Sequence, residues 1–309
     1  MDERSSLDIP KKGNHSDKVK GDTSMSRRVA IISDTDASLP ADIIARYKIG
    51  QVPITVEFGE ESFESDVEIT DTELFARIDR EGVLPTTSAP APGAFAKAYE
   101  EAFAAGADAI VCLCVSAEVS ATYGAAVVAR DMMPEREIAV IDTQSLSMGQ
   151  GFMAIAAAEA AEAGASLDEI VARAQDVGQR AYLYASLATL KYLAMSGRVG
   201  HLAAGVAGLL NVKPILTIRD GKLDLLERVR TRKKAWGRTI ELLSETLAGR
   251  PVERMAVIHV AVPDEAERFR QLACAILNCP PQVLICDLGA GLSVHSGRGL
   301  VGAVVVAGE

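Results

Sequence analysis

Short runs rich in Val and Ile alternate with segments of helical periodicity, and this alternation restricts the possible folds more than any other feature of the sequence. In the first half such runs occur at residues 29–33, 51–58, 109–115 and 138–142. Helical patterns separate them, and one of these begins with the capping box Thr70-x-x-Glu73. Continuously apolar strands separated by helices are typical of a parallel sheet covered on both faces. The sequence therefore predicts an α/β protein whose first part is a mostly parallel sheet flanked by helices.

The second half has a different pattern, which favours antiparallel pairing. Two strand-like runs surround Asp220-Gly221, a strong signal for a β-hairpin. A long helix is predicted from about Thr231 to Leu247, and further apolar runs and helices continue to residue 308. This half is predicted to be a mixed α/β sheet domain.

The domain limits are predicted from local signals. A glycine stop and the capping box Ser166-x-x-Glu169 mark the start of a helix leading into the second half. We therefore expect domain one at residues 28–165 and domain two at residues 166–309, with the ligand site at their junction. Residues 1–27 lack hydrophobic periodicity and mix both charges, so we expect a disordered extension there.

Composition and charge restrict the partners. The chain has 309 residues, 49% of them hydrophobic, but no apolar run long enough to span a bilayer and no signal-peptide pattern. We therefore predict a cytoplasmic protein without a stable membrane anchor. Its net charge of −10 argues against binding nucleic acid, which usually requires a basic face.

The metal-binding and redox residue types do not form a recognisable site. The five cysteines are an odd number and have no C-x-x-C spacing, so we expect reduced core residues. The four histidines are scattered, so no metal site and no cofactor are predicted. The segment GQGFMA (149–154) fits G-x-G-x-x-A, but TQSLSM separates it from the preceding strand. We interpret Gly149 and Gly151 as allowing a helix to begin close to another backbone.

Hydroxyl-bearing loops are the main candidates for a binding site. The stretch LPTTSAPAPGAF (84–95) combines three hydroxyls with three prolines, and we expect the prolines to hold Thr87 and Ser88 in a stiff turn before a ligand arrives. An anion that leaves water needs charge-assisted hydrogen bonds in return. A set of loop residues is suited to one carboxylate or phosphate: Thr87, Ser88, Ser120, Thr122, Arg198 and His295.

The basic run RVRTRKKAWGR (228–238) is a positive patch on an acidic chain. It is either a solvated strand end and first helical turn or a surface that attracts an anionic ligand or an acidic partner protein.

Seven sequence blocks, in this order along the chain, resemble the DegV family. The similarity covers nearly the whole chain from residue 29. The blocks are SDTDASLP (33–40), PTTSAPAPGAF (85–95), VSAEVSATYGAA (115–126), VIDTQSLSMGQG (140–151), LKYLAMSGRVG with LLNVKPIL (190–216), RVRTRKKA (228–235) and HSGRGLVG (295–302).

The resemblance implies a two-domain carrier of one long-chain fatty acid, with the carboxylate near the domain junction and the tail buried. It also implies a partner, a separate ATP-dependent fatty-acid kinase that makes acyl phosphate. By motif, Thr87 and Ser120 would contact the carboxylate, with Ser88 beside them and Arg198 and His295 completing the network. The kinase-facing surface would include Arg230, Arg232 and Lys233, and the small-residue segment 200–212 is a candidate wall for the tail.

Departures from the family pattern and two rival functions remain. Ala121 stands where the family commonly has Gly, which could shift a backbone turn; Ala91 and Arg298 replace a usual Ser and a frequent Pro. One rival is a serine-dependent hydrolase or acyltransferase that uses Ser120 or Ser293 with His295, although no G-x-S-x-G is present. The other is a regulatory protein in which the lipid only stabilises the fold.

Overall fold

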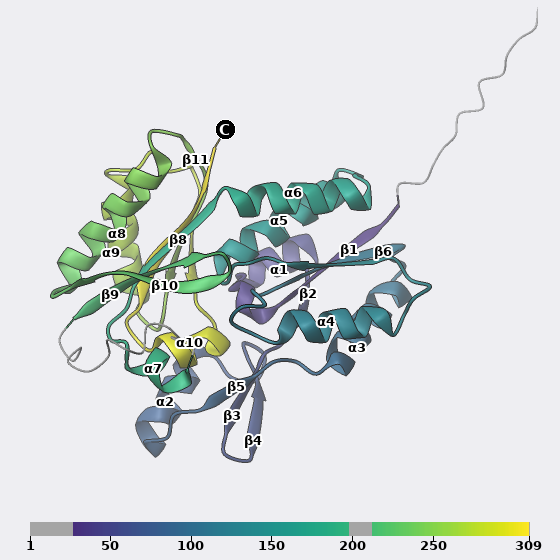
Figure 1. Ribbon diagram of the computed structural model, residues 1–309, viewed down its shortest axis with the longest axis horizontal. Helices are drawn as coiled ribbons and strands as arrows, with labels where there is room; N and C mark the ends of the chain where they lie inside the picture. Colours follow the sequence, from purple (N-terminus) through teal and green to yellow (C-terminus); the bar gives the residue numbers. More distant parts are fainter. Residues whose placement is uncertain (1–26, 198–211, 309) are drawn as a thin grey trace, which may run out of the picture.

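The computed structural model describes residues 27–197 and 212–308, which form two large sheets with helices around and between them (Figure 1). The predicted disordered extension lies outside the described residues, except for Arg27. Within the described ranges, no helix is long and apolar enough to cross a membrane.

The first sheet has four parallel strands in the order β2-β1-β6-β7. Its elements are β1 (Val29–Asp34), α1 (Ala41–Tyr47), β2 (Gly50–Val52), α3 (Pro92–Ala104), β6 (Ala109–Cys114), α4 (Thr122–Asp131) and β7 (Ile138–Asp142). Every residue of β6 is buried, as expected for a strand covered on both faces. Phe95 and Tyr99 of α3 pack with Ile32 and Ile110 on one face, and the other face belongs to the larger core with α5 (Met148–Glu162) and α6 (Leu167–Gln179).

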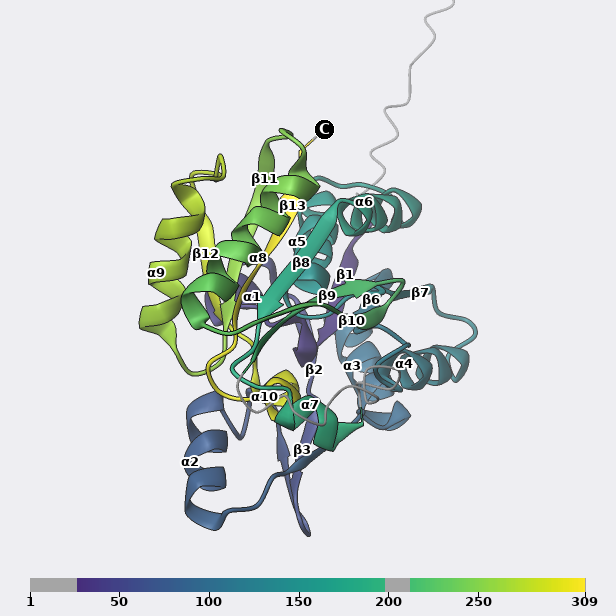
Figure 2. The same cartoon turned by 60° about the vertical axis from the view of Figure 1, so that its left-hand side comes forward.

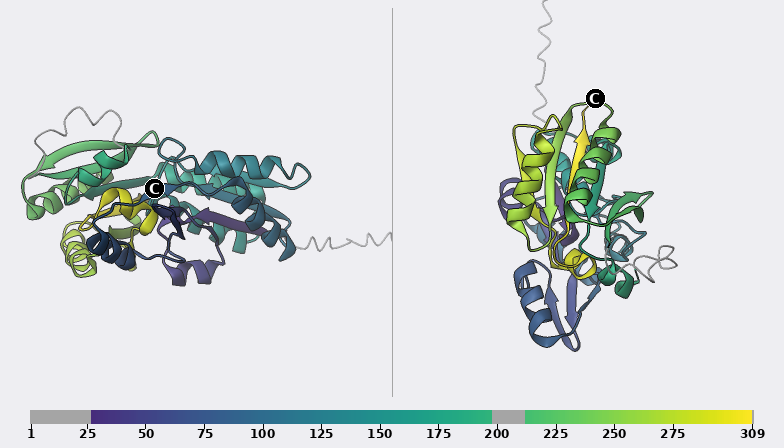
Figure 3. Two further views of the ribbon diagram at one scale, coloured as in Figure 1. Left: turned by 90° about the horizontal axis from the view of Figure 1, so that it is seen from below. Right: turned by 90° about the vertical axis from the view of Figure 1, so that its left-hand side faces the viewer.

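The second sheet has six strands in the order β10-β9-β8-β13-β11-β12, of which only β11 and β12 pair in parallel. The strands are β8 (Ala181–Ser186), β9 (Lys213–Arg219), β10 (Lys222–Val229), β11 (Val252–His259), β12 (Val283–Asp287) and β13 (Val301–Ala307). The outer face carries α8 (Arg232–Leu247) and α9 (Pro263–Cys274), at the opposite end of the long axis from α3 and α4 (Figure 3). The fold class predicted from the sequence, a parallel sheet followed by a mixed sheet, is confirmed.

Helix α5 lies between the two sheets. It contacts β1 and β6 on one side and β8, β11 and β13 on the other. All residues from Met148 to Ala158 are buried, which explains why this part of the helix carries mostly small or apolar side chains on every side. A Cβ on Gly151 would lie 2.7 Å from the carbonyl oxygen of Ala37, so the predicted close approach to another backbone is confirmed for Gly151. At Gly149 the close neighbour is the side chain of Ser145, so the prediction of a backbone approach is wrong there.

A small antiparallel sheet, three helices and a 3₁₀ turn lie beside the meeting point of the two large sheets (Figure 2). The elements are the 3₁₀ turn η1 (Thr35–Ala37), β3 (Thr55–Phe58), β4 (Glu61–Glu64), α2 (Asp71–Glu81), β5 (Thr86–Ser88), α7 (Lys191–Ser196) and α10 (Ala290–Ser296). The predicted strand 51–58 is divided into β2 and β3, because Pro53 has no N–H for a ladder. The segment 84–95, which was expected to contain a stiff turn at Thr87 and Ser88, instead contains the strand β5, which pairs with β3.

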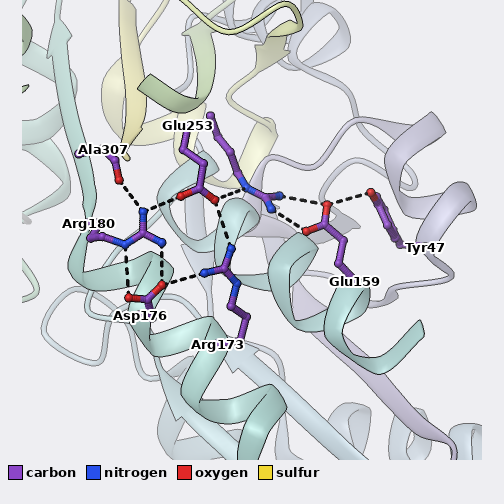
Figure 4. A network of polar contacts seen from close by, with 8 residues as sticks. Tyr47, Glu159, Arg173, Asp176, Arg180, Glu253 and Ala307 are labelled. Atoms are coloured by element: carbon purple, nitrogen blue, oxygen red, sulfur yellow. Dashed lines mark hydrogen bonds and ion pairs between the residues drawn. The ribbon is translucent and has the colours of Figure 1, made fainter. Parts of the chain in front are cut away.

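A polar network joins helices α5 and α6 to the second sheet (Figure 4). Arg180 donates to Asp176 of α6 and to Glu253 of β11, at 2.6 Å each. Arg254, also on β11, donates to Glu159 of α5 at 2.6 Å. Because Arg180 and Arg254 are largely buried, these charge-assisted bonds fix how α5 and α6 meet the second sheet.

The predicted helix caps and the predicted hairpin, which depend on residues close along the chain, are confirmed. Both predicted capping boxes form, at Thr70 with Glu73 and at Ser166 with Glu169. The hairpin at Asp220-Gly221 forms between β9 and β10, with φ of 49° and 75° at these two residues.

The prediction that all cysteines are reduced is wrong for one pair. Cys274 and Cys279 form a disulfide, whereas Cys112, Cys114 and Cys286 are free and buried. Cys274 ends α9, and the chain then turns so that the Cα atoms of the pair are 5.3 Å apart, within disulfide range. Neither the odd number of cysteines nor the absence of C-x-x-C spacing reveals this return of the chain at a helix end.

Candidate functional site

The candidate site begins at the carboxyl edge of the parallel sheet. From β1 the chain crosses to β2 on one side, and from β6 it crosses to β7 on the other, so the loops after β1 and β6 diverge. Ligands of open α/β sheets bind at such switch points. Asp34 at the end of β1 holds both loops, because its carboxylate accepts from the N–H of Val115 at 2.7 Å and of Asp36 at 3.1 Å. Burial raises the pKa of Asp34 to about 6, although these hydrogen bonds oppose the rise.

A cavity of about 510 Å³ opens between these loops and the second sheet, within the usual range for small-molecule sites. The loops, β5 and α10 contribute its polar lining. The second sheet and the segments beside it contribute its apolar lining. The apolar lining includes Leu146, Leu183, Ala185, Leu187, Leu193, Leu216, Leu223, Ile258, Leu288 and Leu300.

Thr87 and His295 meet in this cavity although 208 residues separate them. The Oγ1 atom of Thr87 lies 2.8 Å from Nε2 of His295. Thr87 lies on β5, so its side chain points to the opposite face from those of Thr86 and Ser88. The hydroxyl can donate to the imidazole or accept from it, according to the tautomer.

His295 lies on helix α10, and side chains from an earlier part of the chain hold this helix in place. Its first N–H groups donate to neighbouring side chains, from Ala290 to Asp66 at 3.2 Å and from Gly291 to the hydroxyl of Ser65 at 2.9 Å. The hydroxyl of Ser293 donates to Asp71 at 2.9 Å. Burial raises the pKa of Asp71 to about 7, the bond from Ser293 opposes this rise, and the charges of neighbouring carboxylates add to it.

Ser120 ends the loop that follows β6 and lines the same cavity. Its Oγ lies 2.8 Å from Oγ1 of Thr122 and accepts from the Thr122 N–H at 3.3 Å. When Thr122 also donates its hydroxyl proton, the proton of Ser120 is available to a ligand. Ala121 has φ −78°, which suits alanine, so this departure from the family pattern requires no shift of the turn.

The other predicted ligand residues differ in placement. Ser88 lines the cavity, but its hydroxyl donates to Glu57 at 2.8 Å. Arg198 and the predicted tail wall up to residue 211 lie outside the described residues. In the basic run, Arg232 pairs with Glu265, and the residues Arg230 and Lys233 are exposed.

Among the described residues, the geometry argues against Ser293 as the nucleophile of the rival hydrolase. Ser293 is fully buried and bonded to Asp71, and it is two residues from His295 on one helix, where side chains do not face each other. The hydroxyl of Ser120 lies beside that of Thr122, and Nε2 of His295 lies beside the hydroxyl of Thr87.

Sequence reasoning missed most of the apolar wall. Strand β8, which supplies Leu183 and Ala185, was not predicted, and η1 adds Asp36 to the polar lining. The block SDTDASLP contained the only signal for Asp36.

Comparison with known proteins gives consistent results. A family model described as "Uncharacterised protein, DegV family" matches residues 28–308. A DegV domain-containing protein of Streptomyces coelicolor is 40% identical over 287 residues, which cover 91% of this chain and 99% of that protein.

Two solved structures share the fold over nearly their full lengths. One describes fatty acid binding of a DegV family protein from Thermus thermophilus; its TM-score is 0.85 at 31% identity, covering 91% of this chain and 99% of that one. The other is DegV from Bacillus subtilis, described as a fatty acid binding protein; its TM-score is 0.80 at 30% identity, covering 92% of this chain and 100% of that one.

Proposed function

This chain belongs to the DegV family, and we propose that it binds one long-chain fatty acid and presents it to a separate ATP-dependent fatty-acid kinase. The solved relatives that bind fatty acids support the ligand class. The observation that carries the proposal is the cavity, which combines the Thr87–His295 pair with a wall of leucine and isoleucine.

The apolar wall matches the tail of such a ligand. Burying about 14 methylenes at roughly 0.8 kcal/mol each contributes on the order of 11 kcal/mol, before the costs of association and ordering. A ligand held in this way should remain bound through purification. The nearby leucines come mainly from the second sheet and its flanking segments, so the tail would extend away from the hydroxyls.

The polar lining matches the head group. Thr87, Ser120 and His295 can each donate a hydrogen bond to a carboxylate. In the contact between Thr87 and His295, either the hydroxyl or the imidazole can be the donor. Ser88 would act through Glu57 and the shape of β5, since its own hydroxyl donates to that carboxylate. Buried prolines at positions 85 and 90 flank β5 and would limit how far Thr87 moves before the ligand arrives.

The protein itself would act as a carrier, and the kinase would supply the catalysis. In the kinase reaction a carboxylate oxygen attacks the γ-phosphorus of ATP, the bond from that phosphorus to the bridging oxygen breaks, and ADP leaves. Arg230, Arg232 and Lys233 are our candidates for the kinase-facing surface, because exposed cations attract an acidic partner.

The proposal is tested by reconstitution. Delipidated protein is loaded with palmitate and mixed with a fatty-acid kinase subunit and ATP, and acyl phosphate is trapped with hydroxylamine as the hydroxamate. We expect hydroxamate only when all components are present. Arg230→Ala should lower its formation and leave palmitate affinity unchanged, whereas Lys97→Ala, at an exposed site on α3, should change neither. Palmitate binding without any hydroxamate would contradict the kinase role and leave the carrier role.

A further inference from the structure

The turn between β9 and β10 packs directly against the loop that follows β6. The hydroxyl of Ser116 donates to the carbonyl oxygen of Gly221 at 2.8 Å, and Lys222 Nζ lies 3.3 Å from a carboxylate oxygen of Glu118. A Cβ on Gly221 would lie 2.6 Å from Ser116 Oγ and 3.1 Å from Glu118 Cγ, and its φ is +75°. The contact therefore requires glycine for two reasons, the close approach and the backbone conformation.

Ser116 is also the base of the single helical turn that ends at Ser120. Its carbonyl oxygen accepts from the N–H groups of Val119 and Ser120, at 3.1 Å each. Its own N–H donates to the carbonyl of Ser145 at 2.9 Å, and its side chain is fully buried. A shift of Ser116 would therefore move Ser120.

The same hairpin forms part of the apolar wall. Leu216 of β9 and Leu223 of β10 line the cavity, and β10 is the edge strand of its sheet. Asp220 and Gly221 also border a second, polar cavity of about 470 Å³. Because this cavity leaves the turn without dense packing on one side, the position of the turn depends more strongly on its contact with Ser116 and Glu118.

We infer that Ser116 and Gly221 are positioning residues for carboxylate recognition, because their contact sets where the hydroxyl of Ser120 lies. This inference rests on the proposed function. It assigns the β9–β10 hairpin two connected roles, a wall for the tail and a support for the loop that meets the head group. A disturbed contact should therefore weaken binding of a fatty acid more than binding of the matching alcohol, which has no carboxylate.

The test compares Gly221→Ala with Gly249→Ala in the delipidated full-length protein. Gly249 has φ +83° and no atom within 4 Å of its would-be Cβ, so its variant carries similar backbone strain without the contact. Palmitate and hexadecanol are each titrated against a displaceable fluorescent fatty-acid probe. We expect Gly221→Ala to weaken palmitate binding by about tenfold relative to Gly249→Ala and to change hexadecanol binding by less than about threefold.

Ser116→Ala provides a second test that does not depend on how Gly221→Ala folds. It removes the hydroxyl and should also weaken palmitate selectively. In the double variant the new methyl no longer meets Oγ, so the combined loss should be smaller than the product of the single losses.

Two results would overturn the inference. One is palmitate binding by Gly221→Ala and Ser116→Ala that matches Gly249→Ala. The other is an equal loss for palmitate and hexadecanol, which would indicate a general structural role. If the unmodified protein bound neither palmitate nor the probe, the proposed function itself would fail, and this result is distinct from the first two.

Discussion

Replacing Thr87 by Val should weaken fatty-acid binding, because the change removes one hydroxyl and keeps the shape of the side chain. The lost group lies 2.8 Å from Nε2 of His295 and lines the cavity. A hydrogen bond to a charged group contributes about 1.5–3 kcal/mol. Since about 1.4 kcal/mol corresponds to a tenfold change in affinity, the Kd for palmitate should rise between about tenfold and about 150-fold.

Thr86→Val is the matched control. Thr86 precedes Thr87 on β5, is exposed, and its hydroxyl interacts with Glu57 on the other face of the strand. Calorimetric titration of delipidated protein with palmitate should give the same Kd for this variant as for the unmodified protein. Hexadecanol should bind all three proteins about equally, because it lacks the carboxylate.

Equal palmitate affinities for Thr87→Val and Thr86→Val would refute this reasoning. The head group would then lie elsewhere in the cavity. A parallel loss of hexadecanol binding would also refute it, since the damage would then concern the cavity and not carboxylate recognition.

Three further predictions follow from other parts of the molecule. Burial raises the pKa of Asp71 to about 7, so its contribution to stability is full at acid pH and is lost as the pH rises toward and through that value. Because the ordinary pKa of an aspartate is 3.8, this loss falls between about pH 4 and about pH 7. Asp71→Asn should therefore gain stability relative to the unmodified protein as the pH rises from about 4 to about 7 in urea unfolding, and a constant difference would contradict this. Ala185→Leu should fill part of the cavity, so palmitate affinity should fall while decanoate affinity is kept, and equal losses would count against the apolar wall. Alkylation of denatured protein, followed by mass spectrometry, should modify three cysteines before reduction and five after it; five before reduction would exclude the Cys274–Cys279 disulfide.

The features predicted correctly from the sequence depend on interactions close along the chain. The capping boxes join residues three apart, and the Asp220-Gly221 turn needs only the positive φ that Gly adopts without strain and Asp tolerates. Alternating strands and helices likewise predicted the fold class, because the order of elements limits how sheets form.

Apart from the Cys274–Cys279 disulfide, which joins residues five apart, the errors concern contacts between distant residues. Strand β5 has three residues and forms because β3 accepts it as a partner, which local pattern does not encode. Because Thr87 and Ser88 were predicted to lie in a turn, their placement on opposite faces of a strand could not be predicted. The pairing of Thr87 with His295 also depends on α10, which Ser65, Asp66 and Asp71 hold in place from a separate part of the chain.

Native mass spectrometry of the purified protein, followed by denaturing extraction, tests the central claim most directly. We predict one bound species per chain whose mass matches a long-chain fatty acid, and its recovery on extraction would also identify the preferred chain. A protein without such a species, which also fails to take up added palmitate or oleate, would contradict the claim that this cavity holds a fatty acid.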